Sequence, residues 1–92
     1  MRYTKNKRDA NEGAIVEYLR KCGYYCWLMV APCPFDLLVW RKGVPCFVCL
    51  EVKTAHGRAT EAQERFWEWT EGLPRYFVRT PEAALATVQA HC

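Results

Sequence analysis

The chain has 92 residues, enough for one domain that would span residues 1–92. Hydrophobic residues make up 51% of it and aromatic residues 14%, a composition typical of a globular protein and not of a disordered one. The net charge of +3 permits nucleic-acid binding without requiring it.

The sequence shows no sign of secretion or membrane insertion. Basic and polar residues 1–8 are not followed by the apolar stretch of a secretory signal. No apolar run approaches the roughly 18 residues that cross a membrane. We therefore expect a cytoplasmic protein whose six cysteines are reduced. Cys46 and Cys49 have a zinc-like spacing, but residues i and i+3 of a strand face opposite sides and cannot grip one ion.

The first half of the chain predicts a helix and three strands. Residues 1–8 are expected to form a flexible basic arm. Asp9 or Asn11 can cap a helix that ends at Gly23. Strands are expected over residues 24–30, 35–41 and 46–54, with a tight turn at 42–43. The second and third strands are apolar on both faces, as expected at the centre of a sheet covered on one or both sides.

The second half predicts a helix, a strand and a last helix. Thr60 to Gln63 resembles a capping box that opens a helix ending near Gly72. A short strand over residues 76–78 follows, and Pro81 begins a helix that runs to about Ala90. The predicted order is αβββαβα, an α/β sandwich.

Three charged residues interrupt the apolar strands. Asp36 stands among Phe35 and Leu37–Trp40, and Glu51 and Lys53 interrupt the third strand. A buried charge is costly unless it is paired or bound to a metal. Glu51 and Lys53 are two residues apart and point to one face of their strand. If the second and third strands form a hairpin, Asp36 lies near Glu51.

This trio suits metal-assisted chemistry. Two neighbouring carboxylates repel each other, and a divalent cation relieves that repulsion; oxygen ligands favour Mg²⁺ or Mn²⁺. A water on the metal can become a nucleophile, while Lys53 offers a positive charge to a phosphoryl oxygen. The alternative is a plain salt bridge among Asp36, Glu51 and Lys53, which would require all three charges to reach a solvent-exposed rim of the sheet.

The motifs around these residues resemble a known group of enzymes. Pro34-Phe35-Asp36 followed by Glu51-Val52-Lys53 resembles the PD-(D/E)xK nuclease superfamily. The segment 11–16, with Gly23 ending the helix, is similar to the first helix of archaeal Holliday-junction resolvases. The segment 51–54, a loop containing Gly57, and then Thr60 and Gln63 resemble the virus-type replication-repair nuclease (VRR-NUC) branch. The resemblance covers residues 11 to 83 and implies a restriction-endonuclease-like core, with a central mixed sheet flanked by helices.

The resemblance also implies roles for individual residues. Asp36 and Glu51 would bind the metal, with the main-chain carbonyl of Val52 completing its shell, and Lys53 would be the catalytic lysine. The remaining implied catalytic residues are Glu12, which would join the acidic cluster, and Gln63, which would support the site. The sequence departs from the family pattern in one respect, because Phe35 separates Pro34 from Asp36. Candidate DNA contacts are Arg8 in the basic arm and His56 and Arg58 in the loop after Lys53.

Two of these residues have competing interpretations. Glu12 shares a helical face with Ile15, Val16 and Leu19, whereas Glu17 lies on the opposite side; Glu12 could also be a first-turn acid favoured by the helix dipole. Gln63 could serve only the capping box, or it could turn inward from the face that it shares with other inward-facing positions of its helix.

The function implied is a Mg²⁺- or Mn²⁺-dependent DNA endonuclease acting on branched DNA such as four-way junctions, in a bacterial or phage-infected cell. Stand-alone members of the resembling branch act as homodimers, which present two active sites to a symmetric junction. The alternatives are a flap or nonspecific nuclease of phage replication and repair, and a non-catalytic DNA-binding module.

Overall fold

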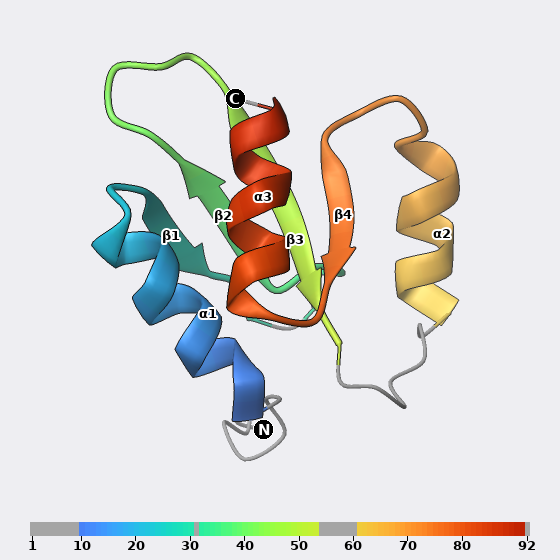
Figure 1. Ribbon diagram of the computed structural model, residues 1–92. Helices are drawn as coiled ribbons and strands as arrows, with labels where there is room; N and C mark the ends of the chain where they lie inside the picture. Colours follow the sequence, from blue (N-terminus) through green and yellow to red (C-terminus); the bar gives the residue numbers. More distant parts are fainter. Residues whose placement is uncertain (1–9, 31, 54–60, 92) are drawn as a thin grey trace.

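The computed structural model describes residues 10–30, 32–53 and 61–91. Helices and strands follow each other in the order αβββαβα, as the sequence predicts (Figure 1). They are α1 (Ala10–Lys21), β1 (Tyr25–Leu28), β2 (Leu37–Trp40), β3 (Phe47–Val52), α2 (Glu61–Trp69), β4 (Arg75–Val78) and α3 (Pro81–His91).

The ends of these elements follow local chemistry. Gly23 and Gly43 have positive φ angles of 93° and 82°, where they end α1 and turn β2 into β3, as glycine does most readily. The predicted strands are too long, however. β1 ends at Leu28 and β2 begins at Leu37, so Asp36 stands immediately before a strand instead of within it. The second helix also ends earlier than expected, at Trp69.

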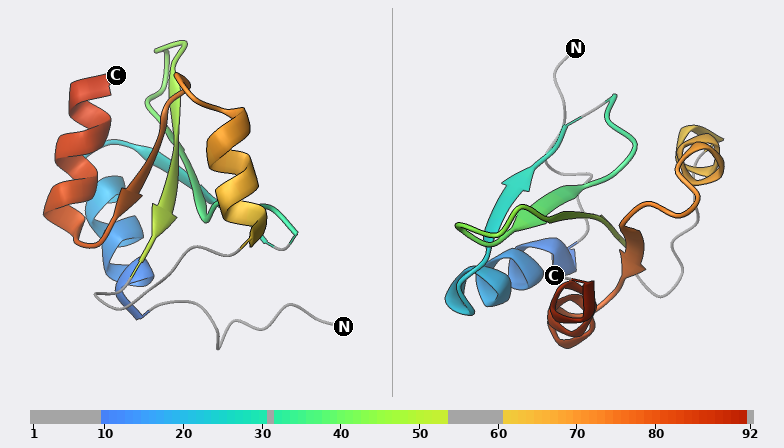
Figure 2. Two further views of the ribbon diagram at one scale, coloured as in Figure 1. Left: turned by 90° about the vertical axis from the view of Figure 1, so that its right-hand side faces the viewer. Right: turned by 90° about the horizontal axis from the view of Figure 1, so that it is seen from above.

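The four strands form one open mixed sheet with the order β1-β2-β3-β4. β1, β2 and β3 are antiparallel neighbours, and β4 runs parallel to β3. Helices α1 and α3 lie together on one face, while α2 stands on the other side of the sheet beside β4 (Figure 2). The model is therefore an α/β structure with a central sheet between two helical layers of unequal coverage.

The hydrophobic core lies between the sheet and the pair α1 and α3. Every second strand residue points into it, as the alternation of a β-strand requires. Its members are Ile15, Val16, Leu19, Tyr24, Cys26, Leu37, Val39, Val48, Leu50, Val52, Val78, Ala84 and Val88. Helix α2 has no buried residue and contributes nothing to this core.

The structure bears on two further expectations, the lack of a membrane-spanning segment and the state of the cysteines. No helix within the described part of the chain is long and apolar enough to cross a membrane. The expectation that all cysteines are reduced is contradicted at Cys46, which is disulfide-bonded. Cys22, Cys26, Cys33 and Cys49 carry free thiols.

The central position of Leu50 gives a first test. Its side chain is fully buried, so Leu50→Ala removes core contacts and leaves a cavity. We expect the free energy of unfolding to fall by about 2–5 kcal/mol in urea denaturation. Leu73→Ala is the matched control, because Leu73 is 58% exposed and should lose little stability. An equal loss in both variants would contradict the placement of the core.

Candidate active site

The register of β2 and β3 brings the two acidic residues together. Leu37 pairs with Leu50, so the next antiparallel step sets Asp36 opposite Glu51. The backbone of Asp36 continues the ladder, although β2 begins one residue later. Its N–H donates to the Leu50 carbonyl at 3.0 Å, and its carbonyl accepts from the N–H of Met29 at 2.8 Å. The hairpin expected from the sequence is confirmed, and with it the proximity of Asp36 and Glu51.

The Asp36 side chain is held by the neighbouring strand. Its Oδ2 accepts a hydrogen bond from the backbone N–H of Val52 at 2.8 Å. This contact fixes the carboxylate against the end of β3. The sequence predicted a role for the carbonyl of Val52, but the contact that the structure shows for Val52 is through its amide.

Glu51, Lys53 and Gln63 form a closed ring of polar contacts. The Glu51 carboxylate is 2% exposed, and its Oε2 accepts a 2.5 Å hydrogen bond from Nε2 of Gln63. The same Oε2 lies 3.2 Å from Nζ of Lys53. Nζ also donates to Oε1 of Gln63 at 3.1 Å. Gln63 therefore turns inward from α2 and bridges the two charged side chains, one of the two alternatives that the sequence left open.

The ion pair between Glu51 and Lys53 does not lie on an exposed rim. The side chains of Lys53 and Glu51 are only 11% and 3% exposed, and β3 is an inner strand of the sheet. A simple surface salt bridge, the alternative considered from the sequence, therefore does not describe this site. Burying an ion pair carries a large desolvation cost, which structural stability alone rarely repays.

The second oxygen of Glu51 is the unusual atom of the site. Oε1 is buried and has no hydrogen-bond partner within the described part of the chain. Burial and the repulsion of Asp36 together raise the pKa of Glu51 to about 7, although the contact with Lys53 opposes the rise. A cation bound next to this oxygen and to Asp36 would stabilise the ionised form of both carboxylates.

The residues present fit a divalent cation held largely by water. Among the residues described, no three His, Cys, Asp or Glu side chains lie close enough together to hold a metal ion. The site therefore offers two carboxylates, Asp36 and Glu51. Mg²⁺ is commonly bound through one or two carboxylates and keeps several of its waters, so this pair is sufficient for it.

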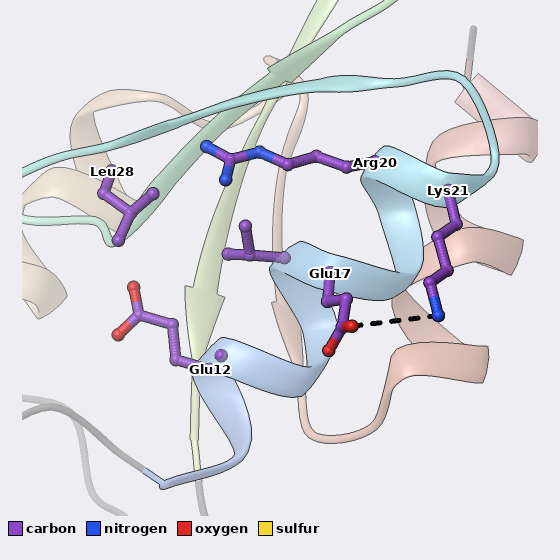
Figure 3. Close-up of a pocket in the computed structure, with 7 residues that line it drawn as sticks. Glu12, Glu17, Arg20, Lys21 and Leu28 are labelled. Carbon is purple, nitrogen blue, oxygen red and sulfur yellow. Dashed lines mark ion pairs between the residues drawn. The ribbon is translucent and has the colours of Figure 1, made fainter.

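Glu12 is a buried acidic residue at the start of α1. It lies in the first turn of α1 and is 3% exposed, which confirms that it faces inward. Its carboxylate points toward Leu28, on the helix side of the sheet (Figure 3). Among the described residues, Glu12 forms no group of three metal-ligating side chains with Asp36 and Glu51. Glu17 is solvated as expected, with a side chain that is 71% exposed and 3.7 Å from Lys21.

Asn11 makes a structural contact that the sequence did not indicate. The sequence suggested a capping residue, but α1 begins at Ala10 and the Asn11 side chain turns toward the end of the sheet. Its Nδ2 donates to the carbonyl of Arg79 at 2.7 Å and to that of Lys53 at 3.3 Å. One amide thus joins the start of α1, the end of β3 and the junction between β4 and α3.

Helix α2 is attached to the rest of the protein by residues of its C-terminal half. The rings of Phe66 and Phe35 lie 5.4 Å apart, next to Asp36, and Trp67 stacks on Phe77 of β4 at 4.4 Å. Arg75 donates to the Trp67 carbonyl at 2.5 Å and so binds the C-terminal half of the helix. These contacts hold α2 in a position from which Gln63 reaches Glu51, although no residue of the helix is buried.

Some of the predicted residues cannot be placed. Arg8, His56 and Arg58, the candidate DNA contacts, lie outside the described residues, as do Thr60 of the expected capping box and the basic arm. The structure thus brings together Asp36, Glu51, Lys53 and Gln63.

Comparison of the chain with protein-family models, characterised proteins and solved structures gave no match. Function is therefore inferred from the chemistry of these side chains and from the motifs in the sequence.

The raised pKa of Glu51 predicts a pH-dependent stability. Between its ordinary value of 4.5 and about 7, folded Glu51 retains a proton that the unfolded chain has released. Stability should therefore fall as the pH rises through this window in the absence of divalent cations. Glu51→Gln lacks this titration, so its free energy of unfolding relative to the wild type should increase from about pH 5 to about pH 8.

Urea denaturation over that pH range measures the difference. Glu17→Gln is the control, since this exposed side chain should leave the wild-type pH profile unchanged. A pH-independent difference between Glu51→Gln and wild type would show that Glu51 ionises normally.

Proposed function

We propose that this chain is a Mg²⁺- or Mn²⁺-dependent endonuclease that hydrolyses phosphodiester bonds in DNA. The observation that carries the proposal is the buried Glu51 carboxylate. It faces Asp36, has one oxygen without a hydrogen-bond partner and contacts the lysine two residues along the strand. Stability alone gives no reason to place such a cluster on an inner strand, whereas metal-assisted hydrolysis of a phosphodiester uses carboxylate ligands for the metal and a nearby positive charge.

Each residue has a role in that chemistry. When bound, the divalent cation supplies Lewis acidity and an activated water. Asp36 and Glu51 would hold the cation, and the Val52 amide fixes the orientation of Asp36. Lys53 neutralises charge that develops on the phosphoryl oxygens. Water adds its oxygen to phosphorus, the P–O bond to the leaving group breaks, and the leaving oxygen takes up a proton.

The fold is compatible with this assignment. The αβββαβα order and the mixed sheet agree with the restriction-endonuclease-like core that the motifs imply. In such an arrangement the carboxylates lie where two central strands adjoin, as Asp36 and Glu51 do here. The specific restriction-endonuclease-like topology is part of the proposal.

The proposed substrate is branched DNA, with the four-way junction as the first candidate, and this choice rests on the motif resemblance. A homodimer would present two sites to a symmetric junction and allow paired cuts. A flap or nonspecific nuclease would cut other substrates equally well. A DNA-binding module without activity would bind DNA but would not need the Asp36–Glu51 pair to bind a cation.

Cleavage of labelled DNA tests the activity. We expect the wild type to cut a four-way junction with Mg²⁺ or Mn²⁺ in preference to a flap and a plain duplex. Asp36→Asn retains an acceptor for the Val52 amide but loses charge, and Lys53→Ala removes the cation. Each should lower the cleavage rate by about 100-fold or more, because groups that stabilise transition-state charge typically contribute that much.

Glu17→Gln and Lys21→Ala serve as matched controls, since they alter an exposed ion pair of the same charge types. Both should cut at the wild-type rate. Calorimetry with Mn²⁺ separates the alternatives, because an enzyme should show metal binding that Asp36→Asn weakens. Absence of cleavage and of metal binding in the folded wild type would refute the proposal.

Gln63 gives a finer test. It contacts Glu51 and Lys53 but has no charge, so it should position them without holding the cation itself. Gln63→Ala should reduce metal affinity or cleavage by about 10- to 100-fold, the range typical of residues that orient metal ligands. Gln63→Glu should tighten metal binding by adding a carboxylate. If both variants behaved as wild type in calorimetry and cleavage, Gln63 would have no positioning role.

A further inference from the structure

A row of aromatic side chains crosses the sheet on the side of α2. Tyr25 of β1 is the direct partner of Trp40 of β2, and Trp40 is the direct partner of Phe47 of β3. The rings of Tyr25 and Trp40 lie 5.6 Å apart. Tyr25 and Phe47 are nevertheless 46% and 56% exposed. Trp27, two residues along β1, points to the same face and is 64% exposed. We refer to Tyr25, Trp27, Trp40 and Phe47 as the aromatic face.

No helix of the described chain covers the aromatic face. Helices α1 and α3 lie on the opposite side of the sheet, and α2 stands beside β4, away from β1 and β2 (Figure 2). Helix α2 itself has no buried residue. This side of the sheet therefore carries large apolar side chains of the kind that are usually buried, and the described residues do not bury them.

The exposed area is large for a chain of this size. Aromatic side chains have about 150–250 Å² each, so the exposed fractions of Tyr25, Trp27 and Phe47 amount to roughly 350 Å². Exposed apolar patches of a few hundred Å² mark interaction sites on monomers. A stable interface buries about 800 Å² on each partner, so this patch could form most of the apolar part of one.

We propose that the aromatic face binds the same face of a second copy of the chain, sheet against sheet. The four side chains carry no charge, so they lack the lysine and arginine groups whose charge dominates the binding of phosphates in nucleic acids. A chain with a net charge of +3 meets its own copy with least repulsion through an uncharged surface. A broad sheet face made of flat rings is also suited to self-pairing about a two-fold axis, in which identical surfaces meet.

The interface would leave the proposed active site accessible. Glu51 lies four residues along β3 from Phe47, about 13 Å at the rise of a β-strand. A two-fold axis through the aromatic row would place the two Asp36–Glu51 pairs on opposite sides of the interface. The location of the interface thus refines the proposed homodimer, but neither DNA nor metal is needed to test it.

The test is the mass of the full chain in solution, by light scattering or sedimentation, without DNA or divalent cations. We expect the wild type to have twice the mass of one chain at micromolar concentration. Trp27→Glu should reduce this to the mass of one chain, because the new charge would be buried against its copy. Trp69→Glu is the matched control: Trp69 is 75% exposed on α2 and should leave the dimer intact.

Phe47→Ser provides a second variant on another strand, should Trp27→Glu fail to fold by circular dichroism. A monomeric wild type, or a dimer that survives both Trp27→Glu and Phe47→Ser, would overturn the interface. Loss of the dimer in Trp69→Glu alone would overturn it as well, in favour of α2. A folded dimer that cuts no DNA would refute the nuclease and leave the interface standing, so the two proposals fail separately.

Discussion

The antiparallel pairing of β2 with β3 is the constraint on which the candidate site depends. It fixes Leu37 against Leu50 and thereby sets two carboxylates opposite each other at the end of the sheet. Burial, together with their repulsion, raises the pKa of Glu51, and one of its oxygens has no hydrogen-bond partner among the described residues. A shift of register by one residue would turn Glu51 into the core face and separate it from Asp36 and Gln63. The same backbone contacts that stabilise the sheet therefore hold the charged groups in place.

One face of the sheet carries the hydrophobic core, and the other carries the polar groups of the candidate site. The core lies entirely between the sheet and the pair α1 and α3. The other face carries Glu51, Gln63 and the aromatic face, with only partial cover from α2. Such a division is expected in a small chain, where polar groups of a site would otherwise displace part of an already limited core.

The sequence predicted the features that follow from local periodicity. Glu51 and Lys53 share a face because they are two residues apart in a strand, and a turn at Gly43 brings Asp36 back toward them. The inward turn of Gln63 followed from helical spacing, although capping remained open. The contacts that escaped prediction join distant segments: the Val52 amide with Asp36, and Asn11 with two carbonyls at the ends of β3 and β4. The inward direction of Glu12 was predictable from helical spacing, while its catalytic role stays a prediction.

The position of α2 has a consequence for how such a protein can change. The helix supplies Gln63 to the charged cluster yet buries none of its own residues, and aromatic and arginine contacts attach it to the sheet. Substitutions on its surface would therefore alter the surroundings of the cluster at little cost to folding. In evolution or in design, α2 is the segment in which new substrate preferences could accumulate while the rest of the fold stays intact.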